Sequence, residues 1–576
     1  MANQLKNHPS PYLALHGNDP VDWMEWGKPA LDKAKKENKL LLVSVGYFSC
    51  HWCHVMQRES FSDKGIAKIL NKNYISVKVD RELNPVLDKR LIDFVTVTNG
   101  TAGWPLNVFI TPEGYPLVGA TYLPRKNLAS VLDQLDEKWK SERESLSSQA
   151  KEMNATLVSM LEKQERSVEG NMKDLADKYV DVAMENADTL QGGFGDQLKF
   201  PQIPQLWALL KLNKLKKNKD ADEFINLTLK QMAQRGLHDE LAGGFYRYAV
   251  DPNWDTPHFE KMIYTNALMP LLYFDAANQY GNDNYKKIAL ETLYFLQNEM
   301  LGEKNAFISS LSAVDDKNVE GGFYLWQQQE LKKILIADEL KMANLYWNLN
   351  QTKEFEAGNL PRQTLSIEEL AKRLSISPQQ AASSIDNLKE KLKTHRNKTR
   401  KLPRDSKLLS GMNGLALAAF SEGIKRDKAF MPTGQKLSTF LISLWDGKVL
   451  HRSAANNDPG TLYDYAAVAW GLIKWGAAEN DNNAKQIGQA IAKAAWDKFH
   501  INNTWVENPG SLLPQGLQQA HIADSALVSA ETLLVEASNL SMNPLLKDKV
   551  QTVLKNITRS LETDLFSYAS LLAISK

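Results

Sequence analysis

Cysteine is nearly absent from this chain: its 576 residues include only two, Cys50 and Cys53. So few cysteines exclude a small fold held together by several disulfides. A disulfide across so short a loop removes little entropy from the unfolded chain, so it would add little stability. Because the only two cysteines lie three residues apart, we expect the pair to take part in a chemical reaction rather than to stabilise the fold.

Long hydrophobic runs and an excess of charge are lacking too. The longest apolar stretch, residues 40–45, has the length of a strand, whereas a bilayer-spanning helix needs ~20 residues. Residues 1–9 are polar and lack the apolar core of a signal peptide. The net charge of +1 gives no reason to expect nucleic acid or a membrane as partner. As the sequence stands we expect a cytoplasmic protein, or a periplasmic one if a leader peptide was removed.

The first part of the chain alternates helix and strand patterns. Residues 40–45 are typical of a buried strand, residues 74–80 alternate like a second one, and residues 106–110 and 116–122 flank a turn. Helices are predicted over residues 30–38, 50–61, 63–70, 85–98 and 128–162. This order, a parallel pair followed by a hairpin, predicts an α/β thioredoxin-like domain over residues 1–165.

Strand patterns nearly vanish beyond a polar linker at residues 164–171. Helical periodicity recurs over residues 172–188, 204–217, 219–236, 260–279, 283–300, 326–349, 366–394, 409–425, 430–445, 462–478, 483–499, 524–540 and 543–574. Gly-Gly-Phe occurs at 192–194, 243–245 and 321–323, each time between predicted helices. Paired helices with similar loops predict an all-α toroid of the (α/α)6 barrel type over residues 172–576, and an open solenoid is the alternative.

The cysteine pair lies where a strand gives way to a predicted helix. The reactive species is the thiolate, which the positive end of a helix dipole stabilises, and His51 adds positive charge when protonated. Cys53 follows one helical turn later and can resolve a mixed disulfide. We therefore predict Cys50 as the exposed attacking thiol and Cys53 as the buried resolving thiol.

A proline supports this interpretation. Trp104–Pro105 precedes the next strand, where thioredoxin folds place a cis-proline beside the disulfide, so we predict a cis bond. The candidate catalytic residues are Cys50, Cys53, His51, Trp52 and Pro105.

Three other interpretations of the motif remain. Cys50 to His54 spells the attachment motif of c-type haem, but no second axial ligand is evident. A metal site would need four ligands within five residues, which cannot easily surround a tetrahedral ion. The third alternative is an inert reduced pair. We expect no metal and no cofactor.

The helical part holds a cluster of polar residues suited to sugar chemistry, which needs a base, a carboxylate and hydroxyl-binding groups. The candidate substrate-binding residues are Arg247, Asp251, Trp254, His258, Glu260, Lys261, Tyr264, Asn266, Asp315 and Asp464. Further loop candidates are Asp239, Asp405 and Lys407. Since Pro257 ends an extended segment, His258 and Glu260 are expected at a loop–helix junction. The alternative is that such residues form buried pairs that close the loops of a barrel.

Several motifs of this chain occur together in one known family. They are Asn7–Leu13, Asn18–Trp23, Cys50–Met56, Glu59–Phe61, Val77–Glu82, Gly103–Leu106, Gly192–Gly195, Lys199–Pro201, Gly243–Phe245, Arg247–Tyr248, Pro257–Met262 and Asn413–Leu415. With them the chain resembles the spermatogenesis-associated protein 20 family. The resemblance implies a thioredoxin-like domain fused to a six-hairpin, glycosidase-like or epimerase-like toroid, and no settled reaction. Thr265 and Met412 depart from the family pattern, which usually has Asp and Trp there.

Two functions from different classes follow. The first is a thiol–disulfide oxidoreductase whose helical domain binds or positions a protein thiol or disulfide substrate. The alternative is an epimerase-like, glycosidase-like or carbohydrate-binding protein of carbohydrate metabolism, with a small carbohydrate as partner and an accessory redox domain. A third hypothesis is an interaction scaffold. Neither nucleic acid nor a membrane is an expected partner.

Overall fold

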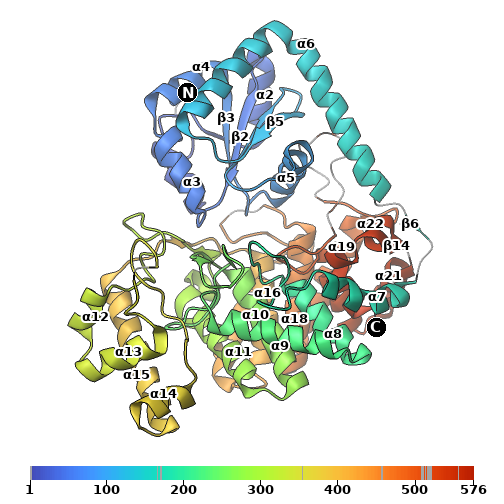
Figure 1. Cartoon of the computed structure of the whole chain (residues 1–576). Coiled ribbons are helices and arrows are strands. Elements are labelled where there is room, and N and C mark those ends of the chain that lie inside the picture. The colour runs from blue at the N-terminus through green and yellow to red at the C-terminus, as the bar shows by residue number, and fades with distance from the viewer. Residues whose placement is uncertain are drawn as a thin grey trace. The chain divides into compact units, whose positions relative to one another are not determined.

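The computed structural model describes residues 3–164, 167–168, 171–352, 354–455, 458–507, 512, 514, 520, 522–555 and 557–575 (Figure 1). The chain forms two compact units. Unit 1 groups Met1–Ser167 with Asp405–Lys407 and Phe499–His521, and unit 2 comprises Val168–Arg404, Leu408–Lys498 and Ile522–Lys576. Of the predicted linker at 164–171, residues 165–166 and 169–170 lie outside the described residues.

Unit 1 is built on a five-stranded sheet in the order β1-β3-β2-β4-β5. β1 and β2 run parallel to β3, whereas β4 is antiparallel to both β2 and β5. The strands are β1 (Met24–Glu25), β2 (Leu41–Gly46), β3 (Ile75–Asp80), β4 (Leu106–Ile110) and β5 (Pro116–Ala120). A parallel pair followed by a hairpin is the thioredoxin-like arrangement, which confirms the predicted fold of this part.

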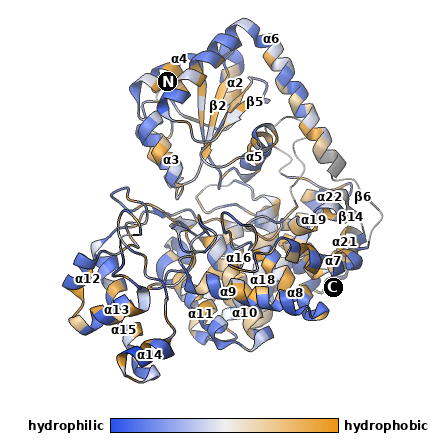
Figure 2. Ribbon diagram, in the orientation of Figure 1, coloured by the Kyte–Doolittle hydropathy of each residue, from blue (hydrophilic) through white to orange (hydrophobic). Residues whose placement is uncertain are grey.

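Both faces of the sheet are buried because strand residues alternate between two hydrophobic cores. Leu42 belongs to one core, while Leu41, Val43 and Val45 belong to the other. Figure 2 shows β2 in hydrophobic colours and α6 largely in hydrophilic ones. The helices of this unit are α1 (Pro11–Leu15), α2 (Lys28–Glu37), α3 (His51–Met56), α4 (Lys64–Asn73), α5 (Pro85–Asn99) and α6 (Arg125–Gln164).

Unit 2 closes six inner helices into a ring, because each packs on the next and the last on the first. These are α8 (Ile203–Lys216), α10 (Ile263–Tyr280), α16 (Ser410–Gly423), α18 (Leu462–Glu479), α20 (Ala530–Leu540) and α23 (Ala569–Ile574). Outer helices lie between them in sequence: α7 (Met172–Glu185), α9 (Lys219–Gln234), α11 (Asp283–Phe295), α17 (Met431–Ser443), α19 (Asn482–Phe499) and α21 (Pro544–Lys555). The closed ring confirms the predicted toroid, and the open-solenoid alternative is wrong.

Small residues let the inner helices approach closely. A Cβ on Gly471 of α18 would lie 2.3 Å from the carbonyl oxygen of Gly414 on α16, and one on Gly414 would lie 2.5 Å from the oxygen of Ala467. The two backbones therefore touch where any larger side chain would separate them.

An insertion between α11 and α16 has a hydrophobic core of its own. It holds α12 (Gln328–Ile334), α13 (Ala337–Trp347), α14 (Ile367–Leu374) and α15 (Pro378–Thr399). The single helices predicted over 326–349 and 366–394 are each two helices. The first breaks because the carboxylate of Glu339 accepts from the amide of Ile336 and starts a new helix.

The remaining elements are short. Two-residue strands are β6 (Ser167–Val168), β7 (Tyr248–Ala249), β8 (Pro257–His258), β9 (Lys261–Met262), β10 (Ser310–Leu311), β11 (Arg404–Asp405), β12 (His500–Ile501), β13 (Thr504–Trp505) and β14 (Ile557–Thr558). Single helical turns are η1 (His16–Asn18), η2 (Gln57–Phe61), η3 (Leu296–Met300), η4 (Glu303–Asn305), η5 (Lys428–Phe430) and η6 (Leu565–Tyr568), with the short α22 (Arg559–Thr563). None of the described helices is both long and apolar enough to cross a bilayer.

Candidate functional site

The cysteine pair sits at the N-terminus of α3, directly after β2. Cys50 caps the helix, because its sulfur accepts a hydrogen bond from the amide of Cys53 at 3.2 Å. The two cysteines form a disulfide. The Cys50 sulfur therefore lies at the positive end of a helix, as the sequence predicts.

One part of the prediction is wrong: Cys50 is buried. Its exposed fraction is 3% and that of Cys53 is 2%. The loop before the helix places Tyr47 and Phe48 in the same hydrophobic core as both cysteines. Trp52 is the exposed member of the motif, at 51%.

The Trp104–Pro105 peptide bond is cis, as predicted. The indole of Trp104 packs against the core that contains the cysteines, and its Nε1 donates to Asp88 at 2.7 Å. The guanidinium of Arg81 lies 4.1 Å from the Trp104 ring and 4.0 Å from the ring of Tyr47. A fixed cation therefore lies in the aromatic surroundings of the disulfide.

The two histidines of the motif differ. His51 is partly exposed and its ring contacts Trp52. The Nε2 of His54 lies 2.6 Å from the carbonyl oxygen of Phe48, and burial lowers the pKa of this imidazole. His54 is thus a neutral group that fixes the loop.

Tyr12 is a residue of this site that sequence reasoning missed. Its hydroxyl oxygen and the sulfur of Cys53 lie 2.2 and 2.8 Å from the point where a Cβ on Gly46 would stand. The hydroxyl is buried and has no hydrogen-bond partner among the described residues. Burial, then the carboxylate of Asp80, raises its pKa well above the usual value, so it remains a donor. Its proton can therefore serve a thiolate on Cys53.

Lys78 is a buried lysine on the strand beside β2. Lys78 on β3 donates to the hydroxyl of Ser44 on β2 at 3.0 Å, and burial lowers its pKa to about 7. No pattern around residue 78 predicted its burial, because a lysine in an alternating strand is usually exposed.

The described residues contain no cluster of three or more His, Cys, Asp or Glu side chains that could hold an ion.

The repeated Gly-Gly-Phe loops of unit 2 have a structural explanation. In the first, Asp188 accepts from the amides of the following turn, and the ammonium of Lys199 binds its carboxylate at 2.8 Å. In the second, Asp239 accepts in the same way and Lys261 binds it at 2.8 Å. The paired glycines adopt positive φ values between 74° and 77°. The Asp239–Lys261 pair therefore closes its loop in the same way as the Asp188–Lys199 pair.

Other predicted substrate-binding residues also serve the architecture. The amide of Asn266 bonds to both backbone groups of Phe245, as Asn413 does with Phe307 one hairpin later. Asp251 and Asp315 cap their own turns, and Trp254 donates to the carbonyl of Gln191. Asp464 caps α18 and forms an ion pair with Arg452. Tyr264 is buried. Lys407 forms an ion pair with Asp405, and both residues belong to unit 1.

Three predicted residues do converge at the start of α10. Arg247 Nη1 and His258 Nδ1 lie 2.9 and 3.2 Å from the same oxygen of Glu260. Burial opposes the ionisation of Glu260, but the Arg247 and His258 charges hold its pKa well below the usual value. Because Pro257–His258 is a strand and α10 begins at Ile263, this is the predicted loop–helix junction.

Sequence reasoning missed the other members of this cluster. The carboxylate of Glu320 lies 3.8 Å from His258 Nε2. The rings of Phe200, Tyr248 and His258 form a stack, with neighbouring centroids 4.5 and 5.0 Å apart. Lys199-Phe-Pro201 was among the family motifs, and its aromatic residue could have suggested this role.

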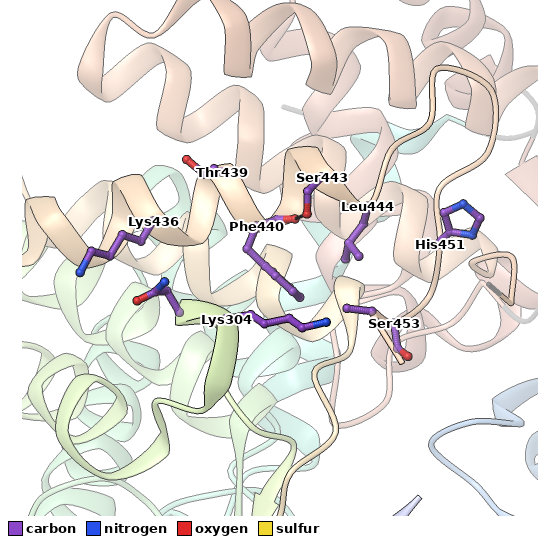
Figure 3. Close-up of a pocket in the computed structure, with 10 residues that line it drawn as sticks. Lys304, Lys436, Thr439, Phe440, Ser443, Leu444, His451 and Ser453 are labelled. Carbon is purple, nitrogen blue, oxygen red and sulfur yellow. Dashed lines mark hydrogen bonds between the residues drawn. The ribbon is translucent and has the colours of Figure 1, made fainter. Parts of the chain in front are cut away.

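Figure 3 shows a separate surface cavity of about 460 Å³ in unit 2. Lys436, Thr439, Phe440 and Ser443 of α17 line one side of it, and Lys304 lies opposite. His451 also lines this cavity, and its Nε2 lies 3.6 Å from the carboxylate of Asp446.

Known proteins match both parts of the chain. Residues 2–158 match the thioredoxin family model Thioredox_DsbH, described as a protein of unknown function, DUF255. Spermatogenesis-associated protein 20 of Mus musculus is 30% identical over 86% of this chain and 70% of its own length. The uncharacterized protein B0495.5 of Caenorhabditis elegans is 32% identical over 77% of this chain and 65% of its own.

The solved structure of a cellobiose 2-epimerase from Spirochaeta thermophila is 12% identical to this chain, with a TM-score of 0.31. The match covers 66% of this chain and 97% of the epimerase chain. That likeness is too distant to inform function. The match to the mouse protein extends through the thioredoxin-like domain and the toroid, and it agrees with the motifs from Asn7 to Leu415. The chain belongs to the spermatogenesis-associated protein 20 family.

Proposed function

We propose that this protein is a thiol–disulfide oxidoreductase that uses Cys50 and Cys53. The observation that carries the proposal is the Cys50–Cys53 disulfide at the N-terminus of α3, where the helix dipole stabilises a thiolate on the capping sulfur. Redox-active pairs of this spacing occupy the same position in thioredoxin-like domains.

The reaction transfers two electrons from the reduced pair to a substrate disulfide. The Cys50 thiolate attacks one substrate sulfur, forms a mixed disulfide and releases the other substrate sulfur as a thiolate, which takes up a proton. Cys53, deprotonated, then attacks the Cys50 sulfur, which releases the second substrate thiol and restores the internal disulfide. Because Cys50 is only 3% exposed, the groups that bury it must move before a protein substrate can reach its sulfur.

Insulin reduction with dithiothreitol as electron source tests this proposal on the full chain. The wild type should accelerate reduction, and Cys50→Ser should lower the rate to that of dithiothreitol alone. Ser62→Ala, which changes an exposed residue of the same unit and keeps both sulfurs, is the matched control and should retain activity. Full activity in Cys50→Ser would refute the proposal.

The cluster at the start of α10 supports a second candidate, a carbohydrate ligand in the toroid. Arg247, His258 and Glu260 combine fixed charge with hydrogen-bonding groups, and the stack of Phe200, Tyr248 and His258 provides aromatic faces of the kind sugars pack on. A thermal-shift screen with monosaccharides and disaccharides tests it. Glu320→Gln should abolish the shift and Glu303→Gln, an exposed carboxylate, should not; no shift with any sugar would reject this candidate.

A further inference from the structure

A second cavity of unit 2 is strongly cationic. It has a volume of about 550 Å³ and lies where the last turn of α15 meets β9 and the end of α11. Its charged lining consists of two carboxylates, Asp239 and Glu299, and five cations: Lys261, Arg396, Arg400, Lys401 and Arg404.

Both carboxylates already have partners. Asp239 binds the Lys261 ammonium at 2.8 Å and the Arg396 guanidinium at 3.2 Å. Glu299 lies 3.9 Å from a guanidinium nitrogen of Arg404. Arg400 is also paired, with Glu330 at 2.6 Å, whereas Lys401 forms no ion pair with any carboxylate in the described part of the chain. The lining therefore keeps an excess of positive charge that attracts anions.

Two buried polar atoms of this lining lack hydrogen-bond partners among the described residues. They are Nε of Arg396 and the hydroxyl of Tyr324. Both residues are only 2% exposed. A buried donor without a partner costs about 1–3 kcal/mol. A guanidinium presents its donors in a plane that matches a carboxylate or phosphate group.

The chain contains an internal comparison that bears on Arg396. The first Gly-Gly-Phe loop closes with Asp188 and Lys199, and the described residues add no arginine to that pair. The second loop has the equivalent Asp239–Lys261 pair, yet α15 of the insertion adds Arg396 to it. Because the loop closes without an arginine elsewhere, loop closure does not explain Arg396.

We propose that this cavity binds a small organic or inorganic anion through a phosphate or carboxylate group. Arg396 Nε and the Tyr324 hydroxyl donate to the bound oxyanion, and Lys401 and Arg404 supply attraction from the exposed side. The volume suits a small metabolite rather than a polymer. The site is separate from the cysteine pair and does not depend on the proposed redox function.

Isothermal titration calorimetry of the full chain tests the proposal with inorganic phosphate, citrate and glucose 6-phosphate, at constant ionic strength in chloride. At least one should bind, and the double variant Lys401→Ala/Arg404→Ala should weaken it at least tenfold. The matched control, Lys304→Ala/Lys436→Ala, removes two lysines from the cavity of Figure 3 and should change the affinity less than twofold.

A third variant addresses the buried donor. Arg396→Lys keeps a cation beside Asp239 but removes Nε, and it should also weaken binding at least tenfold. Preference for citrate assigns a carboxylate ligand, and preference for the two phosphates assigns a phosphate. The proposal is overturned if none of the three anions binds, or if the control weakens binding as much as Lys401→Ala/Arg404→Ala does.

Discussion

Replacing Lys78 with methionine should stabilise unit 1 at neutral and acidic pH. The ammonium of Lys78 is buried, 4.5, 5.1 and 5.5 Å from the ring centres of Phe61, Trp23 and Tyr12. Its hydrogen bond goes to the neutral hydroxyl of Ser44, and it forms no ion pair with a carboxylate within the described ranges. The charge is therefore poorly compensated where it lies.

The magnitude follows from the pKa. Burial lowers the pKa of Lys78 from 10.5 to about 7, and at ~1.4 kcal/mol per unit this costs about 5 kcal/mol of folding free energy below pH 7. Between pH 7 and 10.5 the unfolded chain binds a proton that the folded chain does not, so stability rises with pH across this window. Methionine removes the cost together with a hydrogen bond and a cation–π contact worth roughly 1 kcal/mol each. The net gain should be about 3 kcal/mol at pH 6 and about zero near pH 9.

Amide hydrogen exchange of the full chain, read by mass spectrometry on peptides of β2 and β3, measures this local stability. Lys78→Met should slow exchange at pH 6 and leave it nearly unchanged at pH 9, relative to the wild type at each pH. Lys68→Met, which changes an exposed lysine of α4, is the control and should have no effect. A Lys78→Met protein that is less protected than the wild type at pH 6 would refute the reasoning.

Three further substitutions test other contacts. Tyr12→Phe removes the donor beside Cys53, so the pKa of the Cys53 thiol in the reduced protein should rise by roughly 1 unit. Thiolate absorbance against pH measures this shift, and an unchanged titration would rule out a hydrogen bond from Tyr12 to the Cys53 thiolate. Asn266→Ala removes three hydrogen bonds to the backbone of Phe245 and Met262 and should cost unit 2 about 2–4 kcal/mol in urea unfolding. Asn278→Ala, at an exposed position of the same helix, should cost almost nothing, and equal losses would contradict the structural role. Gly193→Ala adds a Cβ 2.4 Å from a buried indole at a φ of 77°, so it should cost at least about 2 kcal/mol in the same assay, and an unaltered unfolding curve would count against this packing.

The sequence predicts the fold of unit 1 well because its signals are local. Apolar strand runs, the Asp63 helix cap and the proline at the start of α5 lie within a few residues of what they determine. The two-residue strand β1 escaped prediction because Met24–Glu25 is too short for a period-2 pattern. In unit 2 most helices were predictable from periodicity, but the segments 326–349, 366–394 and 543–574 were each predicted as one helix and hold more than one. The insertion with its separate core follows from contacts between distant segments.

The candidate site, too, is predictable where its signals are local and not where it depends on contacts between distant segments. The helix-capping position of Cys50 follows from its place after an apolar strand. Its burial does not, because it depends on a core that brings Cys50 together with residues from distant parts of the chain, such as Leu5 and Trp139. In the toroid, residue types alone suggested sugar chemistry, but Asn266 and Asp251 are held by backbone groups that no sequence pattern reveals.

The most direct test of the central claim is trapping of the mixed disulfide. The full chain with Cys53→Ser, once reduced, should form a covalent adduct with a disulfide-bonded protein, and peptide mass spectrometry should locate the bond at Cys50. The reciprocal variant, Cys50→Ser, should form none under the same conditions. An adduct that forms through Cys53 in Cys50→Ser, or no adduct in Cys53→Ser, would contradict the assignment of Cys50 as the attacking thiol.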